Sequence, residues 1–262
     1  MPDSTSEPAL QPGLSIVVPA FNEEGSIGRS VRDLRAYLDR LDLAWEIVVV
    51  DDGSSDGTGA AVEQYAAVDP RIRMIRGGRA GKGAAVRRGM LEARGVWRFM
   101  VDADLAVPLD NLDRFLRVVR ATPAPDIVIG SREAAGSRRV GEHWLRHSIG
   151  RAFNAYGRLL VLPGMMDTQC GFKLFSAAAT DDLFRRLTID GFAFDVELLV
   201  MARRAGYEIR EAGIEWHGRA DSRVAVSRGA GAFGDVLRIW WNTLAGRYGR
   251  SVRGGVPPER NA

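Results

Sequence analysis

Short apolar runs alternate along the first half of the chain with segments in which apolar residues recur every three or four positions. The length of these runs is typical of buried strands. They cover residues 14–18, 46–50, 72–75 and 97–101. The segment after the first run places Ile27, Val31, Leu34 and Leu38 at helical spacing. This alternation predicts an α/β fold, with a mostly parallel sheet flanked by helices.

The second half of the chain continues the pattern less regularly. It predicts helices over 112–119 and 192–199, and strands over 126–132 and 208–215. Residues 143–160 can form a helix with an aromatic face. By contrast, 167–175 is a polar insert in apolar surroundings.

A final helix is expected over 233–248, and it is amphipathic. Its apolar positions are Phe233, Val236, Leu237, Trp240, Leu244 and Tyr248. Trp240 and Trp241, together with Arg238, Arg247 and Arg250, suit a helix that lies on acidic lipid. The alternative is that this apolar stripe packs onto the rest of the protein. The pattern alone leaves both interpretations open.

The 262 residues, 46% of them hydrophobic, can bury the core of one large α/β domain. We expect this domain over 13–228, an amphipathic membrane-proximal helix over 229–250, and disorder over 1–12 and 251–262. The polar N-terminus resembles neither a signal peptide nor a membrane anchor. No stretch approaches the length of a transmembrane helix. A single cysteine, Cys170, excludes an internal disulfide and fits a reducing compartment.

Positive charge is concentrated in the second half of the chain. Overall, Lys and Arg number 36 against 33 Asp and Glu, a modest excess that gives no reason to expect nucleic acid as a partner. Residues 132–158, however, contain six Arg against two Glu, and 219–253 contain seven Arg against two Asp. An anionic partner is therefore expected to bind this half.

The strongest chemical signal is the pair Asp102 and Asp104, which follows the strand over 97–101. Ligands of open α/β sheets bind at the carboxyl ends of the strands. Two carboxylates at such a strand end suit Mg²⁺ or Mn²⁺. Alternatively, they only end the strand and cap a turn.

Four loops meet at this edge if the strands are parallel. Acidic residues follow the first, second and fourth strands, and 77–83 brings glycines, Arg79 and Lys82 after the third. A nucleotide diphosphate needs this mixture of carboxylates, cations and backbone N–H groups. The glycine segment matches neither a Walker A motif nor a dinucleotide fingerprint, because Gly83 and Val86 stand where those motifs need other residues. A flexible turn remains the alternative for it.

Seven segments in order resemble the family 2 glycosyltransferases of GT-A fold, and more narrowly the polyprenyl-phosphate sugar synthases. They read IVVPAFNEEGSI, EIVVVDDGSSDGT, GKGAAVRRGM, FMVDADLAVP, IVIGSR, DTQCGFKLF and EWHGRADSRV. The last two are most similar to those of dolichyl-phosphate β-glucosyltransferases. The resemblance implies an inverting transferase that moves a sugar, with glucose favoured, from a UDP-sugar to polyprenyl phosphate.

The same resemblance assigns site residues. The nucleotide-sugar site would consist of Pro19, Phe21, Glu23, Asp51, Lys82, Asp102 and Ala103. Asp104 would bind the metal together with Asp102. In related mannosyl enzymes a Gln completes the metal site at the position of Ala106, so the third protein ligand is left open.

The acceptor side is assigned in the same way. The lipid phosphate would be held by Arg132, Arg146, Arg151 and Arg223. The resemblance implies that Asp104, Arg132, Asp167 and Arg223 form the catalytic set, with Asp167 a candidate base. Because a phosphate monoester is already anionic near neutral pH, we predict that Asp167 orients the arginines or the sugar instead.

Three hypotheses follow. The first is a peripheral enzyme on the cytoplasmic face of a membrane, working on lipid phosphate beside a separate membrane protein. Its donor could also be a UDP-N-acetylhexosamine or GDP-mannose. The second keeps the fold but uses a soluble acceptor. The third is a non-catalytic nucleotide-binding protein that docks on a membrane partner through 233–248.

Overall fold

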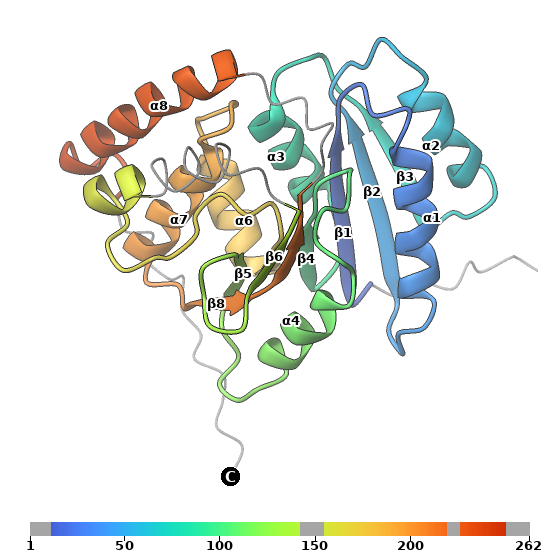
Figure 1. Ribbon diagram of the computed structural model, residues 1–262, viewed down its shortest axis with the longest axis horizontal. Coiled ribbons are helices and arrows are strands. Elements are labelled where there is room, and N and C mark those ends of the chain that lie inside the picture. Colours follow the sequence, from blue (N-terminus) through green and yellow to red (C-terminus); the bar gives the residue numbers. More distant parts are fainter. Residues whose placement is uncertain (1–11, 142–154, 219–225, 250–262) are drawn as a thin grey trace, which may run out of the picture.

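The strands build one central sheet, as the computed structural model shows for residues 12–141, 155–218 and 226–249 (Figure 1). Its order is β3 (Ile72–Arg76), β2 (Trp45–Asp51), β1 (Leu14–Ala20), β4 (Trp97–Met100), β7 (Lys173–Ser176), β5 (Ile127–Ser131) and β8 (Ile209–Gly213). The mostly parallel sheet expected from the sequence is confirmed, and the predicted strands lie within a few residues of the observed ones.

β7 differs from the other strands of this sheet in two ways: the hydrophobic pattern did not predict it, and it runs antiparallel to its neighbours. It pairs antiparallel with β4 on one side and with β5 on the other. It lies in the segment 167–175 that the sequence presented as a polar insert, so a central strand was missed there. The cause is Lys173, a fully buried residue in the middle of the sheet that interrupts the apolar run.

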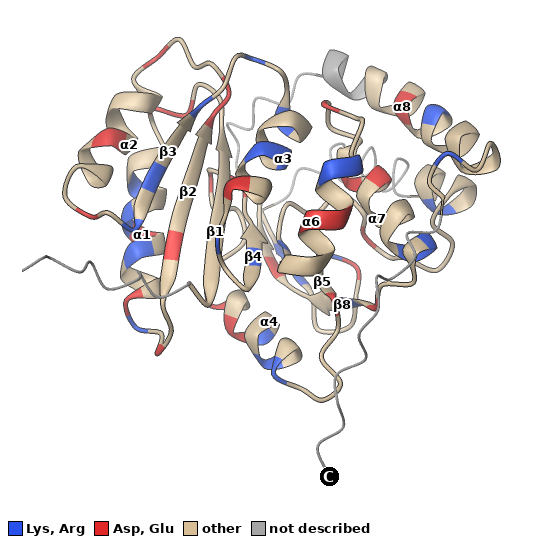
Figure 2. Cartoon of the chain, turned by 180° about the vertical axis from the view of Figure 1, so that it is seen from behind, with Lys and Arg blue, Asp and Glu red and all other residues tan. Residues whose placement is uncertain are grey.

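Helices cover both faces of the sheet. One face packs against α1 (Ile27–Leu38), α2 (Thr58–Ala66) and α4 (Asn111–Val119). The opposite face packs against α3 (Lys82–Glu92), α6 (Ala177–Arg186) and α7 (Phe194–Ala205). Figure 1 and Figure 2 show α1 and α2 on the side away from α6 and α7. Side chains alternate along the strands. Ile16 and Val18 pack in the core on the side of α1, α2 and α4, whereas Val17 packs in the core on the side of α3, α6 and α7.

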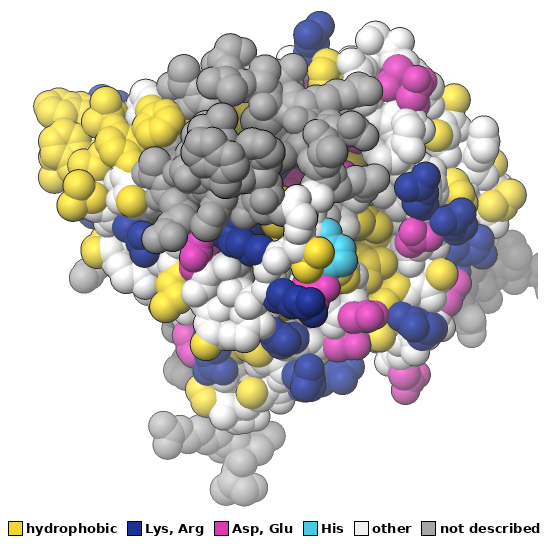
Figure 3. Space-filling view, in the orientation of Figure 1, with side chains coloured by type: hydrophobic (Ala, Val, Ile, Leu, Met, Phe, Trp, Pro, Cys, Tyr) yellow, Lys and Arg dark blue, Asp and Glu magenta, His cyan; other side chains and the backbone are white. Residues whose placement is uncertain are grey.

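α8 spans Val226–Leu244, so it begins and ends earlier than the predicted 233–248. Gly246 adopts a left-handed conformation just beyond its end, which is where helices commonly stop. Val236 and Ile239 are fully buried against the core that contains α7. Trp241 is 60% exposed and Leu244 63% exposed, and Figure 3 shows apolar side chains gathered over this helix. The packing interpretation is therefore confirmed for Val236 and Ile239, whereas contact of the exposed apolar side chains with lipid stays a prediction.

Within residues 12–141, 155–218 and 226–249, no helix has the length and apolar character needed to cross a bilayer.

A second, small sheet lies beside the loop that follows β4. β6 (Arg138–Val140) pairs in parallel with β9 (Glu215–His217). The His217 amide donates to the carbonyl of Ala106 over 2.8 Å, which ties this sheet to the segment after Asp104. The predicted strand over 208–215 thus divides into β8 and β9.

Candidate active site

The loops after β1, β2 and β3 are joined by hydrogen bonds at the carboxyl edge of the sheet. The Asn22 amide donates to Ser54 Oγ over 2.9 Å. Asp52 accepts the amides of Ala80 and Gly81, each at 2.8 Å, one on each carboxylate oxygen. The sequence singled out Asp51 in this loop, but it is Asp52 that holds the glycine segment in place.

The glycine segment is shaped by protein contacts. Gly81 has a φ of +112°, and a Cβ there would overlap with the carbonyl of Asp190. The same carbonyl accepts the Gly83 amide at 2.7 Å. The amides of Ala80, Gly81 and Gly83 are therefore bonded within the protein, so backbone N–H groups at these positions are not available for a phosphate. The side chains of Arg79 and Lys82 remain as the cations of the segment.

Lys82 reaches across to Asp102, whose Oδ1 lies 2.6 Å from the Lys82 Nζ. Burial by itself would raise the pKa of Asp102, but the charge and hydrogen bond of Lys82, together with the charges of Lys173 and Arg132, lower that pKa below its usual value. The Asp102 side chain is still 40% exposed, so a ligand can reach it. Gly171 packs directly on this carboxylate, and a Cβ at that position would overlap with it.

Asp104 lies two residues further along the same loop. Its Oδ1 accepts the amide of Ala106 at 3.1 Å. Leu105 between them has a φ of +48°, a left-handed conformation that is unusual for such a side chain. Because strained residues cluster at ligand sites, this turn is consistent with a loop built to present Asp104.

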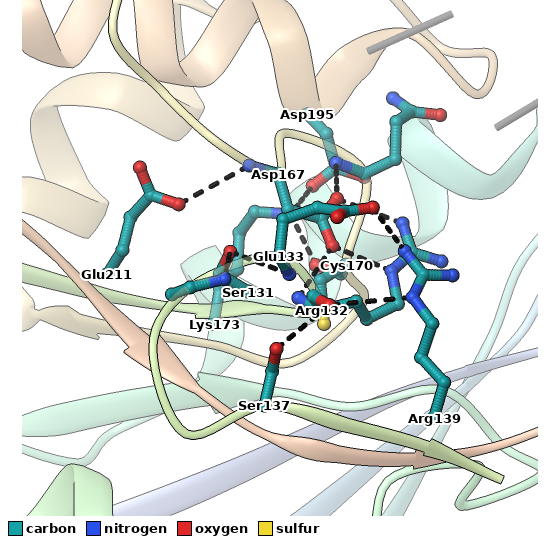
Figure 4. A network of polar contacts seen from close by, with 12 residues as sticks. Ser131, Arg132, Glu133, Ser137, Arg139, Asp167, Cys170, Lys173, Asp195 and Glu211 are labelled. Atoms are coloured by element: carbon teal, nitrogen blue, oxygen red, sulfur yellow. Dashed lines mark hydrogen bonds and ion pairs between the residues drawn. The ribbon is translucent and has the colours of Figure 1, made fainter. Parts of the chain in front are cut away.

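Arg132, at the exit of β5, forms the second charged pair of the site (Figure 4). Its Nε and Nη2 donate to the two carboxylate oxygens of Asp167 at 2.6 and 2.9 Å. Asp167 is fully buried, which alone would raise its pKa, but the bonds from Arg132 lower that pKa to about 2. The guanidinium also lies 5.9 Å from the ring of Trp216 on β9.

A third pair lies deeper. Lys173 Nζ is 2.6 Å from Oδ1 of Asp195 and also donates to the Cys170 carbonyl, as Figure 4 shows. Both side chains are buried, so each charge needs the other. Asp195, within the helix predicted over 192–199, and Lys173 were not among the predicted site residues. Burial raises the pKa of the Cys170 thiol to about 12, so Cys170 is a packing residue rather than a nucleophile.

The three pairs form one electrostatic cluster. Asp195 and Asp104 both act on Lys82, while Lys173 and Arg132 act on Asp102. The cluster contains the carboxylates of Asp102, Asp104, Asp167 and Asp195 and the cations Lys82, Lys173 and Arg132. Carboxylates thus outnumber cations by one among these seven groups, which favours binding of a further cation.

The remaining residues predicted for the nucleotide site lie on the loops after β1 and β2. Phe21 lies under the Arg79 guanidinium at 5.2 Å. Asp51 is buried and accepts the Ser54 amide at 2.9 Å, and Glu23 accepts from Ser26 Oγ at 2.6 Å. Pro19 is the penultimate residue of β1.

The profile of the family described as "Glycosyl transferase family 2" matches residues 15–184. The chain belongs to this family. The match runs from β1 into α6 and so includes Lys82, Asp102, Arg132 and Asp167.

Two curated relatives cover most of this family 2 glycosyltransferase. Dolichyl-phosphate beta-glucosyltransferase ALG5C of Trichomonas vaginalis is 36% identical over 223 residues, which are 81% of this chain and 66% of that protein. Dolichyl-phosphate beta-glucosyltransferase of Saccharomyces cerevisiae is 32% identical over 82% of this chain and 70% of its own. The chain thus spans about two thirds of the length of these relatives.

Among solved structures, glucosyl-3-phosphoglycerate synthase from Mycobacterium tuberculosis, in complex with Mn²⁺, UDP and glucosyl-3-phosphoglycerate, has the same fold. Its TM-score is 0.60 at 19% sequence identity, over 93% of this chain and 82% of that one.

Three arginines predicted for this glycosyltransferase, Arg146, Arg151 and Arg223, lie outside the described residues. The predicted terminal disorder over 1–12 and 251–262 also falls almost entirely outside them. Ala103 is described: it is buried, and its carbonyl accepts Ser30 Oγ at 2.6 Å.

Gln169 is a site feature that sequence reasoning missed. Its Nε2 is buried without a hydrogen-bond partner, the one such side-chain nitrogen or oxygen in the described part of the chain. The backbone N–H of Gln169 donates to Asp167 Oδ1 at 3.1 Å, which places Gln169 beside the pair of Arg132 and Asp167. A buried donor without a partner is uncommon and calls for an explanation such as an absent ligand. The polar insert around it was the only signal in the sequence.

Proposed function

We propose that this family 2 glycosyltransferase transfers a hexose, with glucose favoured, from a UDP-sugar to polyprenyl phosphate and inverts the anomeric centre. The names of the two curated relatives support the acceptor and the sugar. The observation that carries the proposal is the Arg132–Asp167 pair, a fixed cation within the same charged cluster as Lys82 and Asp102.

Arg132 is proposed to bind the phosphate of the acceptor. A guanidinium suits this role because its planar fork matches phosphate oxygens. Asp167 already engages Nε and one terminal nitrogen of Arg132, which fixes the direction of the group. Arg146, Arg151 and Arg223 are proposed to complete the phosphate site.

Asp167 is proposed to act as a positioning residue rather than as a base. Both of its oxygens already accept hydrogen bonds, from Arg132 and from the amide of Gln169. With a pKa of about 2 it has little tendency to take a proton. The acceptor phosphate has its second pKa near 6, so it is largely a dianion at neutral pH and needs no base. Catalysis then rests on orientation and charge neutralisation.

Donor binding is assigned to the other loops. Lys82 and Arg79 are the two cations of the glycine segment, and their charges suit a diphosphate. Phe21 and Asp51 supply an aromatic face and a carboxylate for the uridine, and Pro19 and Glu23 lie beside them. In this arrangement the diphosphate is bound by side chains, because the amides at Ala80, Gly81 and Gly83 are already bonded.

Asp102 and Asp104 are proposed to hold Mg²⁺ or Mn²⁺. Their carboxylate oxygens are the hard donors that these ions prefer, and the excess of carboxylates in the cluster fits a cation. No group of three or more His, Cys, Asp or Glu in the described ranges could hold an ion alone. Two carboxylates nevertheless suffice for Mg²⁺, which keeps waters and substrate phosphates among its ligands. When bound, the ion supplies Lewis-acid stabilisation of the departing UDP.

The enzyme is proposed to work at a membrane surface, on its cytoplasmic face, because its acceptor is a lipid. The exposed apolar side chains of α8 support this location. A separate membrane protein that uses the product is part of the same proposal.

The test is transfer of label from radioactive UDP- and GDP-sugars to polyprenyl phosphate in detergent, with Mg²⁺, with Mn²⁺ and with EDTA. We expect label from UDP-glucose in the organic phase, and none with EDTA. Asp104→Asn should lose transfer with its fold intact, whereas Asp33→Asn on the exterior of α1 should retain it. Label from a UDP-N-acetylhexosamine or GDP-mannose would correct the donor. Binding of UDP without any lipid product would contradict the proposal and favour a soluble acceptor or a binding role.

A further inference from the structure

A cavity of about 350 Å³ lies beside α8. Three arginines line it, Arg186 at the end of α6, Arg238 on α8 and Arg247 after α8, together with Thr188, Asn242 and Tyr248. No Asp or Glu is among its lining residues in the described part of the chain. Figure 2 shows the basic positions of α6 and α8 on the same side of the molecule.

Three acids lie near the three arginines of this cavity, but within the described residues only Asp182 forms an ion pair with one of them. Asp182 pairs with Arg186 at 3.3 Å, and Glu197 accepts from the hydroxyls of Thr188 and Tyr248. Asp235, one turn before Arg238 on α8, partly offsets the charge of Arg238. Among the described residues, the Arg247 side chain is bonded only to the neutral Asn242 side chain, at 3.1 Å. The Arg238 side chain makes no hydrogen bond or ion pair within the described ranges.

The cavity borders the exposed apolar face of α8. At helical spacing Arg238 is followed by Trp241 at i+3 and by Asn242 at i+4, so it lies between the two. Trp241 belongs to the exposed face and Asn242 to the cavity. The exposed face consists of Phe233, Leu237, Trp240, Trp241 and Leu244. A helix with apolar side chains on one side and Arg at the boundary is typical of one that lies in the interface of a bilayer.

We propose that this cavity binds the phosphate headgroup of an anionic membrane phospholipid while the exposed face of α8 enters the acyl region. The occupant is a lipid rather than a free anion, because apolar contact and guanidinium donors are adjacent on one helix. The site is separate from the Arg132 site for the acceptor. The inference rests on the proposed function only in that both place the enzyme at a membrane.

The test measures binding of the full chain to vesicles without substrates. One set is phosphatidylcholine, and the other contains about 30% phosphatidylglycerol. We expect the wild type to prefer the anionic vesicles. Arg238→Gln/Arg247→Gln should lower binding to these vesicles on the order of 10- to 30-fold and remove the preference. Arg32→Gln/Arg117→Gln, which removes two exposed arginines from α1 and α4, should change it by less than about twofold.

A further variant separates the two parts of the surface. Trp241→Gln/Leu244→Gln should weaken binding to both kinds of vesicle by a similar factor, because it removes apolar contact only. The proposal is overturned if Arg238→Gln/Arg247→Gln keeps the wild-type preference, if the wild type has no preference, or if inorganic phosphate abolishes binding at millimolar concentration. Transfer in detergent by Arg238→Gln/Arg247→Gln should equal that of the wild type. Absence of transfer in every variant would instead count against the proposed function.

Discussion

Asp167 binds one edge of the Arg132 guanidinium, because its two carboxylate oxygens accept from Nε at 2.6 Å and from Nη2 at 2.9 Å. The carboxylate is fully buried, while 17% of the Arg132 side chain is exposed. The arrangement fixes the direction of a cation that can still be reached from outside. A phosphate bound there would meet a preorganised charge, which is what catalysis by positioning requires.

The first prediction concerns Asp167→Asn. The amide cannot accept both hydrogen bonds from Arg132, so the guanidinium should lose its orientation. We expect kcat/KM for polyprenyl phosphate to fall on the order of 100-fold, with a higher KM for the lipid and an unchanged KM for the UDP-sugar. Asp167→Glu should recover part of the loss. A general base near neutrality would instead appear as a limb of the wild-type pH profile between about pH 5 and 8 that Asp167→Asn removes.

The second prediction concerns acid stability. The pKa of Asp167 is about 2 in the folded protein and near 3.8 in an ordinary carboxyl, so the group contributes about 2 kcal/mol to the free energy of unfolding above pH 4. Because the folded pKa is the lower one, this contribution should disappear as the pH falls from about 4 to about 2. Urea unfolding of wild type and Asp167→Asn at pH 7, 4 and 3 measures it. A difference between the two proteins that stays constant over this range would contradict the assignment.

The third prediction concerns Gly171, which lies against the Asp102 carboxylate. In Gly171→Ala the added Cβ should displace Asp102 and disturb its ion pair with Lys82. We expect the free energy of unfolding to fall by about 1–3 kcal/mol and the Kd for UDP to rise about tenfold. Gly25→Ala is the matched control, because no atom lies within 4 Å of its added Cβ. Equal UDP binding by Gly171→Ala, measured by calorimetry, would show that Asp102 does not contact the nucleotide.

The sequence predicted the fold well because regular apolar runs report burial directly. It placed Asp102, Asp104 and Arg132 at strand ends, and because β4 and β5 both pair antiparallel with β7, these ends lie at the same edge of the sheet. It missed β7, whose Lys173 is buried only because Asp195, distant in sequence, neutralises it. It also presented the glycine segment as a phosphate cradle, whereas Asp52 and the Asp190 carbonyl use its amides. A local sequence pattern cannot identify hydrogen-bond and ion-pair partners that are distant in the chain.

The last prediction concerns Gln169, whose buried Nε2 has no hydrogen-bond partner in the described part of the chain. An unsatisfied buried donor costs about 1–3 kcal/mol, so Gln169→Leu should leave stability unchanged or raise it by about 1 kcal/mol. If the donor serves a sugar hydroxyl or a phosphate oxygen, the same variant should lower kcat/KM on the order of tenfold. Gln64→Leu on the exposed side of α2 should change neither quantity. Thermal unfolding and initial rates on the same samples give both values. A gain in stability at full activity would mean that no substrate uses this donor.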